Sequence, residues 1–238
     1  MVFEVVRRRK VYEDVASQIE AAITVGHYAV GDQLPSERDL MDQFGVGRPA
    51  IREALLILQR MGLVHLSTGE RARVIQPTIH ALVDQLSGAA RHFLASPGGE
   101  TAFQDARRVF ESAIAYNAAE QASKDDINNL RRALEANRKA LKDMVEFEKT
   151  DIRFHVELTK TGGNPIFLAL HTAIVDWLSM LRHTSLKLPG VAEEAFKSHE
   201  KIFLAIEKRS PTDAWLAMDD HLKKVFQYVK AARSKIAD

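Results

Sequence analysis

Histidine and carboxylate side chains in the second half of the chain are the residues best suited to metal chemistry. Asp151 and His155 are four residues apart in the helical run EKTDIRFHVELTK, so both project from one face. His199 and His221 lie in two later helical runs, each flanked by apolar residues at helical spacing. Those flanks direct both imidazoles toward a helical core. One carboxylate and three imidazoles meeting there would suit Zn²⁺ or a similar divalent ion, with room for exchangeable ligands.

Two other interpretations of these four residues stay open. A histidine that faces a core is usually hydrogen-bonded to a neighbour without any metal. A metal-dependent hydrolase is the alternative function, but it needs a base beside a metal-bound water. Glu157 and Glu200 neighbour two of the candidate ligands, and helical geometry rotates them away. The chain has no cysteine, which excludes thiolate ligands, disulfides and a cysteine nucleophile.

Arginines in the first half of the chain form a second set of candidate functional residues. Arg48 and Arg52 are four residues apart near the start of one predicted helix. Presented amino end first to a major groove, such arginines can pair in bidentate fashion with guanine O6 and N7. Arg38 lies in the first turn of the preceding helix, where the amino end favours a phosphate.

A predicted hairpin over Leu63–Ile75 adds a candidate contact to the minor groove. Thr68 and Gly69 form its narrow tip, and Arg71 and Arg73 alternate on one strand face. Each of these arginines taken alone could equally be a solvated surface residue. Their combination with a tight turn, a capping serine and a hairpin favours DNA binding.

The elements that must position these arginines follow from helical spacing and turn residues. They are, in order, a helix over Val11–Thr24, an extended segment over 27–30, a helix capped by Ser36, a helix over Pro49–Met61 and the hairpin. This is the order of a winged helix-turn-helix. Pro77 then breaks the pattern, so residues 1–76 are predicted to be a DNA-binding domain.

The elements that must position the histidines are all helical, so the chain is predicted to be mainly α. Helices are expected at about 79–95, 101–122, 125–143, 145–161, 165–186, 190–208 and 212–234. Seven helices of this kind pack most simply as one bundle. Residues 77–238 are therefore predicted to be an all-α domain that holds the candidate metal site.

Composition and charge exclude several classes of protein. With 33 Lys and Arg against 32 Asp and Glu in 238 residues, bulk charge cannot hold the chain to nucleic acid or membrane. The basic run Arg7–Lys10 is either an arm on the DNA backbone or a mobile tail. No signal peptide follows it, and the apolar stretch Phe167–Leu178 is too short to span a bilayer. A cytoplasmic protein without a membrane partner is expected.

The string LPSERDLMDQFGVGRPAIREAL resembles the signature of GntR-type bacterial transcription regulators, and the similarity extends over nearly the whole chain. The resemblance implies operator contacts from Arg38, Arg48 and Arg52, and from the wing tip at Thr68 and Gly69. The wing itself departs from the family, because Gly-Glu-Arg-Ala-Arg stands where relatives often carry several glycines.

The C-terminal half resembles the FCD effector domain of this family. Many members have an Asp-x-x-x-His pair followed by two later histidines, and the four candidate ligands match all four positions. The resemblance therefore implies a metal, most simply Zn²⁺. Arg107 matches an arginine that faces the effector pocket, and its guanidinium suits a carboxylate. Arg182 is a further effector candidate or a surface arginine, and His171 either supports the pocket or is structural.

Together these features predict a metabolite-responsive regulator, most simply a repressor, that binds double-stranded operator DNA as a homodimer or a higher oligomer. The effector is expected to be a small organic acid or sugar acid bound near the metal. The segments LSGAARHFLASPGG, NPIFLALHTAIVDWL and GERARV are similar to sialic-acid-responsive repressors, which favours a sugar acid. A constitutive DNA-binding protein is the remaining alternative, and it would leave the metal and arginine pocket without a role.

Overall fold

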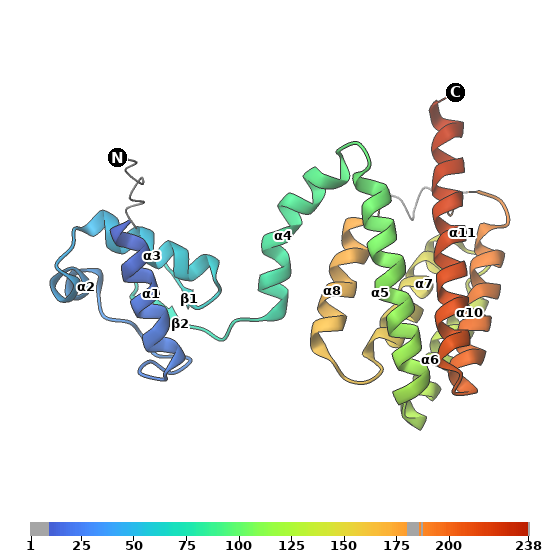
Figure 1. Cartoon of the computed structure of the whole chain (residues 1–238), viewed down its shortest axis with the longest axis horizontal. Coiled ribbons are helices and arrows are strands. Elements are labelled where there is room, and N and C mark those ends of the chain that lie inside the picture. Colours follow the sequence, from blue (N-terminus) through green and yellow to red (C-terminus); the bar gives the residue numbers. More distant parts are fainter. Residues whose placement is uncertain (1–9, 180–185, 187, 238) are drawn as a thin grey trace, which may run out of the picture. The chain divides into compact units, whose positions relative to one another are not determined.

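The computed structural model describes residues 10–179, 186 and 188–237, and this part of the chain is mainly helical (Figure 1). Internal contacts divide the chain into two compact units, Met1–Gln85 and Leu86–Asp238. The division falls inside helix α4 (Ile79–Leu94), shortly after the predicted boundary at Pro77. Among the described residues, no helix combines the length and the apolar character needed to cross a membrane.

Three helices and a small sheet form the first unit. They are α1 (Val11–Thr24), α2 (Glu37–Phe44), α3 (Arg48–Arg60), β1 (Val64–His65) and β2 (Arg73–Val74). Ser36 caps α2, because its hydroxyl accepts a hydrogen bond from the amide of Asp39 and the carboxylate of Asp39 accepts one from the amide of Ser36. Gly45 then ends α2 in the left-handed conformation, at φ 64°. The break between α2 and α3 is therefore short, and the helix-turn-helix forms as predicted.

The wing is an antiparallel hairpin with strands much shorter than expected. Its register is Val64 opposite Val74 and His65 opposite Arg73. Gln33 adds an isolated bridge to Arg73. The extended segment predicted at 27–30 is instead part of a turn, because the carboxylate of Asp32 accepts a hydrogen bond from the amide of Ala29.

One face of α3 forms the centre of the core of the first unit. Its buried residues are Ile51, Ala54, Leu55 and Leu58, which pack with Val15, Ile19, Leu34, Leu40, Val64 and Val74. Each large side chain buried in this way contributes about 1.5–3 kcal/mol relative to its exposed state. Because this face of α3 is fixed inward, Arg48 and Arg52 on the other face are directed to solvent.

The second unit is a helical bundle, to which the described residues contribute the end of α4 and six further helices. They are α4, α5 (Gly99–Gln121), α6 (Lys124–Lys139), α7 (Met144–Lys160), α8 (Pro165–Trp177), α10 (Val191–Glu207) and α11 (Pro211–Ala237). Most bounds agree with the predicted ones, but α8 ends at Trp177, whereas the prediction continued it to residue 186. Residues 180–185 of that prediction lie outside the described part of the chain.

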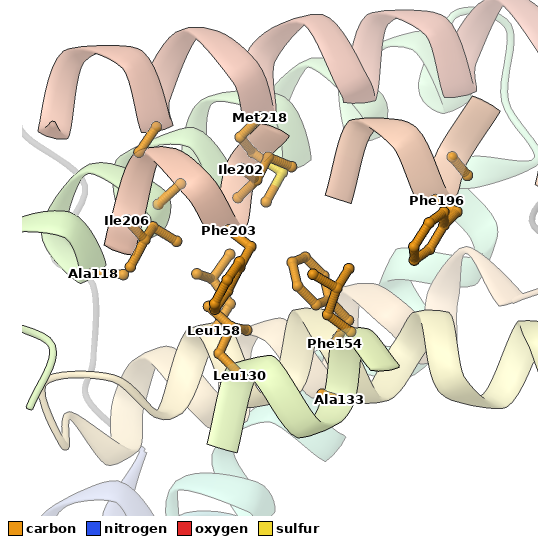
Figure 2. Close-up of a cluster of buried hydrophobic side chains, with 14 of the residues drawn as sticks. Ala118, Leu130, Ala133, Phe154, Leu158, Phe196, Ile202, Phe203, Ile206 and Met218 are labelled. Carbon is orange, nitrogen blue, oxygen red and sulfur yellow. The ribbon is translucent and has the colours of Figure 1, made fainter. Parts of the chain in front are cut away.

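The core of the bundle is made by α5, α6, α7, α10 and α11. Figure 2 shows the buried side chains that meet there, with aromatic rings contributed by α7 and α10. Phe154 of α7 is fully buried and stacks on the ring of His199 of α10, with ring centroids 4.5 Å apart. The apolar core therefore continues directly into the histidine cluster described below.

Candidate functional site

One hollow on the first unit is lined by all six residues that the sequence predicted to contact DNA. It lies among the amino end of α2, the exposed face of α3 and the β1–β2 loop, with a volume of about 710 Å³. The six residues are Arg38, Arg48, Arg52, Thr68, Gly69 and Arg71, and each of them is exposed. The structure thus brings the predicted base-reading, phosphate-binding and wing residues to one surface.

Glu37 at the first position of α2 contacts two arginines in the first half of α3. The Nε atom of Arg48 donates a hydrogen bond to Oε2 of Glu37 at 2.9 Å, and Nε of Arg52 lies 3.9 Å from Oε1. The two arginine side chains nevertheless remain 69% and 68% exposed. Glu37 thereby restricts the orientation of both guanidinium groups without removing them from solvent.

The remaining basic residues of the first unit differ in their roles. Arg73 donates a hydrogen bond from Nη1 to the carbonyl of Gly31 at 2.7 Å, so it fastens the wing to the preceding loop. Arg71 lines the hollow instead. Gly69 at the wing tip has φ 80°, a conformation that favours glycine. The predicted basic arm at 7–9 lies outside the described residues.

Three buried histidines from three helices meet inside the second unit. His155 on α7, His199 on α10 and His221 on α11 each place a ring nitrogen within 4.8 Å of the others. Asp151, one turn before His155, places its Oδ1 atom 3.5 Å from Nε2 of His199. All four residues that the sequence predicted as metal ligands are therefore close together.

The protonation of this cluster suits metal binding. Burial is the main cause that lowers the pKa of His221 well below its ordinary value, and the nearby His199 and His155 lower it further. A neutral imidazole is the form that donates a lone pair to a metal. Nε2 of His155 is buried and forms no hydrogen bond among the described residues, so a cation there would satisfy it. By these criteria the residues fit a divalent metal ion.

Asn137 on α6 fixes the orientation of His199. Its Oδ1 atom lies 2.9 Å from Nδ1 of His199, and its Nδ2 atom donates a hydrogen bond to the hydroxyl of Thr150 at 3.1 Å. The hydroxyl of Thr150 in turn donates to the carbonyl of Glu146 at 2.9 Å. Asn137 and His199 are both fully buried.

Glu111 on α5 is a second buried group beside the histidines. Its Oε2 atom lies 2.6 Å from Nδ1 of His155, and its Oε1 atom lies 3.8 Å from Nε2 of His171. Burial alone would raise the pKa of Glu111, but the charge of Arg107 and the hydrogen bond from His155 help to hold that pKa well below its ordinary value. Glu111 is thus an anion at the base of the histidine cluster, and with His155 and His171 it forms a second group of possible metal ligands.

The two predicted effector arginines have different outcomes. Arg107 is buried on α5, and its Nε atom lies 2.6 Å from Oε1 of Glu111. This places its guanidinium next to the histidine cluster, with a carboxylate of the protein already bound to it. Arg182 lies outside the described residues.

Neither of the two glutamates that the sequence singled out beside the candidate ligands is positioned as the base of a hydrolase. Glu157 forms an ion pair with Lys160 on its own helix, at 3.0 Å, and Glu200 is only partly buried. Glu111 is near the cluster, but its carboxylate is already engaged by Arg107 and His155.

Comparison with protein families assigns both units. The family described as bacterial regulatory proteins, gntR family, matches residues 11–74, and the FCD domain matches residues 103–224. These ranges contain, respectively, the hollow with its arginines and the buried histidine cluster.

Whole proteins are similar to this chain over most of their length. The HTH-type transcriptional repressor NanR of Klebsiella aerogenes is 43% identical over 226 residues, covering 92% of this chain and 85% of the relative. NanR of Escherichia coli K12 is 40% identical over 226 residues, covering 92% and 84%. Among solved structures, Streptococcus agalactiae GntR has a TM-score of 0.60 at 22% identity, over 90% of this chain and 98% of that one.

Proposed function

The chain belongs to the GntR family of bacterial regulatory proteins and carries an FCD effector-binding domain, and from this premise we propose a metal-dependent, acid-responsive repressor. As a family member it is a transcriptional regulator that binds operator DNA, and it is not an enzyme. The proposal concerns the finer points: the sign of regulation, the metal, the effector and the assembly. Repression is supported by the names of the relatives at 40–43% identity.

The hollow of the first unit is the observation that supports a specific role for each DNA-binding residue. Arg48 and Arg52 read base edges in the major groove, because both project from the exposed face of α3 near its amino end. Arg38 and Arg71 line the same hollow and bind phosphates. Thr68 and Gly69 at the wing tip enter the minor groove.

The buried cluster of the second unit supports a Zn²⁺ site that also recruits the effector. Asp151, His155, His199 and His221 are the ligands, since their donor atoms meet and the imidazoles suit a borderline divalent metal. When bound, the ion supplies positive charge for the carboxylate of an acidic effector. Arg107 contacts Glu111 and so lies next to the histidine cluster, where its guanidinium adds a second cation for the effector. Arg182 is a further candidate for binding the effector.

A sugar acid is the proposed effector class. Three segments of the sequence are similar to sialic-acid-responsive repressors, and the relatives at 40–43% identity are named NanR. The effector acts by binding the two arrangements of the regulator with different affinity. A coupling free energy of about 1–3 kcal/mol would change operator affinity roughly 5- to 150-fold.

The test is a thermal-shift screen of organic and sugar acids, N-acetylneuraminate included, on Zn²⁺-loaded and chelator-treated protein. A ligand at a hundred times its Kd stabilises by about 2.7 kcal/mol, which raises the Tm by several degrees. We expect a sugar acid to give this shift only with Zn²⁺ present. In a gel-shift assay, the same acid should change how strongly the protein retards a DNA fragment selected from a random pool. An acid that acts equally after chelation would contradict the metal-dependent part of the proposal.

A homodimer is proposed because two related half-sites require two recognition helices. The exposed face of α5 offers a surface for the second copy. An apolar stripe runs along it at alternating spacings of four and three residues: Ala102, Ala106, Val109, Ala113 and Tyr116. Val109 is 62% exposed, which is unusual for a large apolar residue in the middle of a long helix. This spacing is typical of a helix that packs against another helix.

Replacing Val109 by Glu should convert the dimer to monomers in analytical ultracentrifugation, because the charge would have to be buried in the interface. Val145→Glu is the matched control, since Val145 is 63% exposed on α7. Loss of the dimer in the control and not in Val109→Glu would place the interface elsewhere.

A further inference from the structure

We propose that Glu111 and Asn137 are positioning residues that orient His155 and His199 so that Nε2 of each ring faces the metal. The inference rests on the metal site of the proposed function and concerns two residues outside the ligand set. Glu111 belongs to α5 and Asn137 to α6, two helices that carry none of the four proposed ligands. A metal-bound histidine nearly always has its other ring nitrogen held by such a partner.

The orientation of His199 follows from the hydrogen bonds of Asn137. The hydroxyl of Thr150 gives its one proton to a main-chain carbonyl, so its oxygen must accept from Nδ2 of Asn137. The amide of Asn137 then presents Oδ1, an acceptor, to Nδ1 of His199 at 2.9 Å. Nδ1 of His199 therefore carries the proton, and Nε2 keeps its lone pair. That nitrogen is the one beside Asp151, at 3.5 Å.

The orientation of His155 follows from the charge of Glu111. A carboxylate oxygen 2.6 Å from Nδ1 is compatible only with a protonated Nδ1, because two lone pairs at that distance would repel. In the neutral ring, Nε2 of His155 is then the unprotonated nitrogen. Both ring nitrogens are buried, but Nδ1 faces Oε2 of Glu111, whereas Nε2 forms no hydrogen bond among the described residues. The negative charge of Glu111 further raises the basicity of the ring as a ligand.

Arg107 forms an ion pair with Glu111 and so stabilises its carboxylate form. Its guanidinium lies 2.6 Å from the oxygen of Glu111 that does not face His155, so one carboxylate joins the arginine to the ligand. Both Glu111 and Arg107 are almost fully buried, and neither can relax into water. A charge brought to Arg107, such as an effector carboxylate, would therefore compete with Glu111 and change its hold on His155. Glu111 thus couples the effector side of the site to the metal side.

The test measures metal affinity rather than DNA binding, by competition of Zn²⁺ between the purified full chain and a chromophoric chelator. Glu111→Gln and Asn137→Leu keep the shape of each side chain and should each weaken Zn²⁺ binding by about 10- to 100-fold. Asn137→Asp keeps an acceptor for Nδ1 and should bind within a few-fold of the wild type. Ser112→Ala is the control, since Ser112 follows Glu111 on α5, is fully buried and forms no side-chain hydrogen bond among the described residues.

A spectroscopic readout separates positioning from general loosening of the core. Co²⁺ loaded into the wild type should give the d–d absorption of a histidine-rich site, and the band should change in Glu111→Gln while far-UV circular dichroism does not. Zn²⁺ affinities of Glu111→Gln and Asn137→Leu within twofold of the wild type would overturn the inference. Failure of the wild type to bind either metal would instead overturn the metal site of the proposed function.

Discussion

Glu37 gives the two arginines that are proposed to read bases an internal partner in the absence of DNA. Arg48 and Arg52 share its carboxylate, and the ion pairs are exposed enough that each contributes little to stability. Their effect is on orientation: a guanidinium already held on one edge loses less side-chain entropy when it meets a guanine. At this scale the recognition surface is preorganised by an acidic residue rather than by further basic ones.

Replacing Arg48 or Arg52 with Ala should reduce discrimination between operator bases as well as affinity. A bidentate arginine–guanine pair accounts for about 1–3 kcal/mol, so binding to the preferred sequence should fall roughly 5- to 150-fold, with a smaller loss on mutated sequences. Fluorescence anisotropy on a panel of single-base variants measures this. Arg60→Ala, at the other end of α3, is the control. An unchanged sequence preference in Arg48→Ala and Arg52→Ala would exclude base reading by these residues.

The buried pair of Arg107 and Glu111 should be far more sensitive to loss of one partner than of both. Arg107→Ala leaves Glu111 as a buried anion without its main cation, which costs about 3–5 kcal/mol in stability. Arg107→Leu combined with Glu111→Gln removes both charges and should recover most of that loss. Urea denaturation of the three proteins gives the comparison. A double variant less stable than Arg107→Ala would show that the pair is not the source of the effect.

The low pKa of His221 predicts how the metal-free protein responds to acid. Below about pH 6.5 the unfolded chain protonates this histidine, whereas burial keeps it neutral in the folded state until the pH reaches its lowered pKa. The unfolded state then binds more protons, so stability falls as the pH falls through that window. We expect a loss of up to about 1.4 kcal/mol per pH unit from this residue in chelator-treated protein. His221→Gln should show a flatter dependence in urea titrations from pH 7 to 5; an equal slope would assign the effect to other groups.

At the scale of the element, the helices could be predicted well because their ends are marked in the sequence. Ser36, Ser123 and Asn164 each accept hydrogen bonds from the first turn of their helix, and glycines or prolines stand at most breaks. The extended segment was predicted at the wrong position, because Gln33, rather than residues 27–30, forms the bridge to the wing. A turn closed by the carboxylate of Asp32 is not visible as hydrophobic periodicity.

The capping box at Ser36 should control the local stability of the first unit. Ser36→Ala removes the acceptor for the amide of Asp39 and should cost about 1 kcal/mol. Both tryptophans, Trp177 and Trp215, lie in the second unit, so tryptophan fluorescence reports on that unit alone. The first transition followed by circular dichroism should move to lower urea while the fluorescence transition stays in place. A shift in fluorescence alone would contradict this assignment.

Three residues that the sequence did not single out make contacts between different helices. Glu37, Glu111 and Asn137 each touch a partner on another helix, at separations of 11, 44 and 62 residues. Spacing within one helix predicts which residues share a face, as it does for Asp151 with His155 and for Arg48 with Arg52. It carries no information on which side chain of a neighbouring helix will oppose that face.

At the scale of the molecule, substitutions that abolish metal and effector binding in the second unit should leave DNA binding by the first unit intact. Combining His199→Ala with His221→Ala removes two of the three imidazoles and should abolish Zn²⁺ content and the response to sugar acids. The arginine hollow belongs to the other unit, so DNA binding without effector should persist. Elemental analysis and gel shifts on the same preparations test both parts. Stoichiometric zinc in the double variant would disprove the ligand assignment.

The order of the two units along the chain has a consequence for how new molecules arise. Domains fold largely as units during synthesis, beginning at the amino end. The arginine hollow is complete once residue 85 has left the ribosome, whereas the proposed ligands extend from residue 151 to residue 221. A nascent chain therefore acquires the surface that recognises DNA well before it can sense anything. Under the proposed function, the supply of zinc at the end of translation then determines whether each new copy becomes a switch or stays permanently in one state.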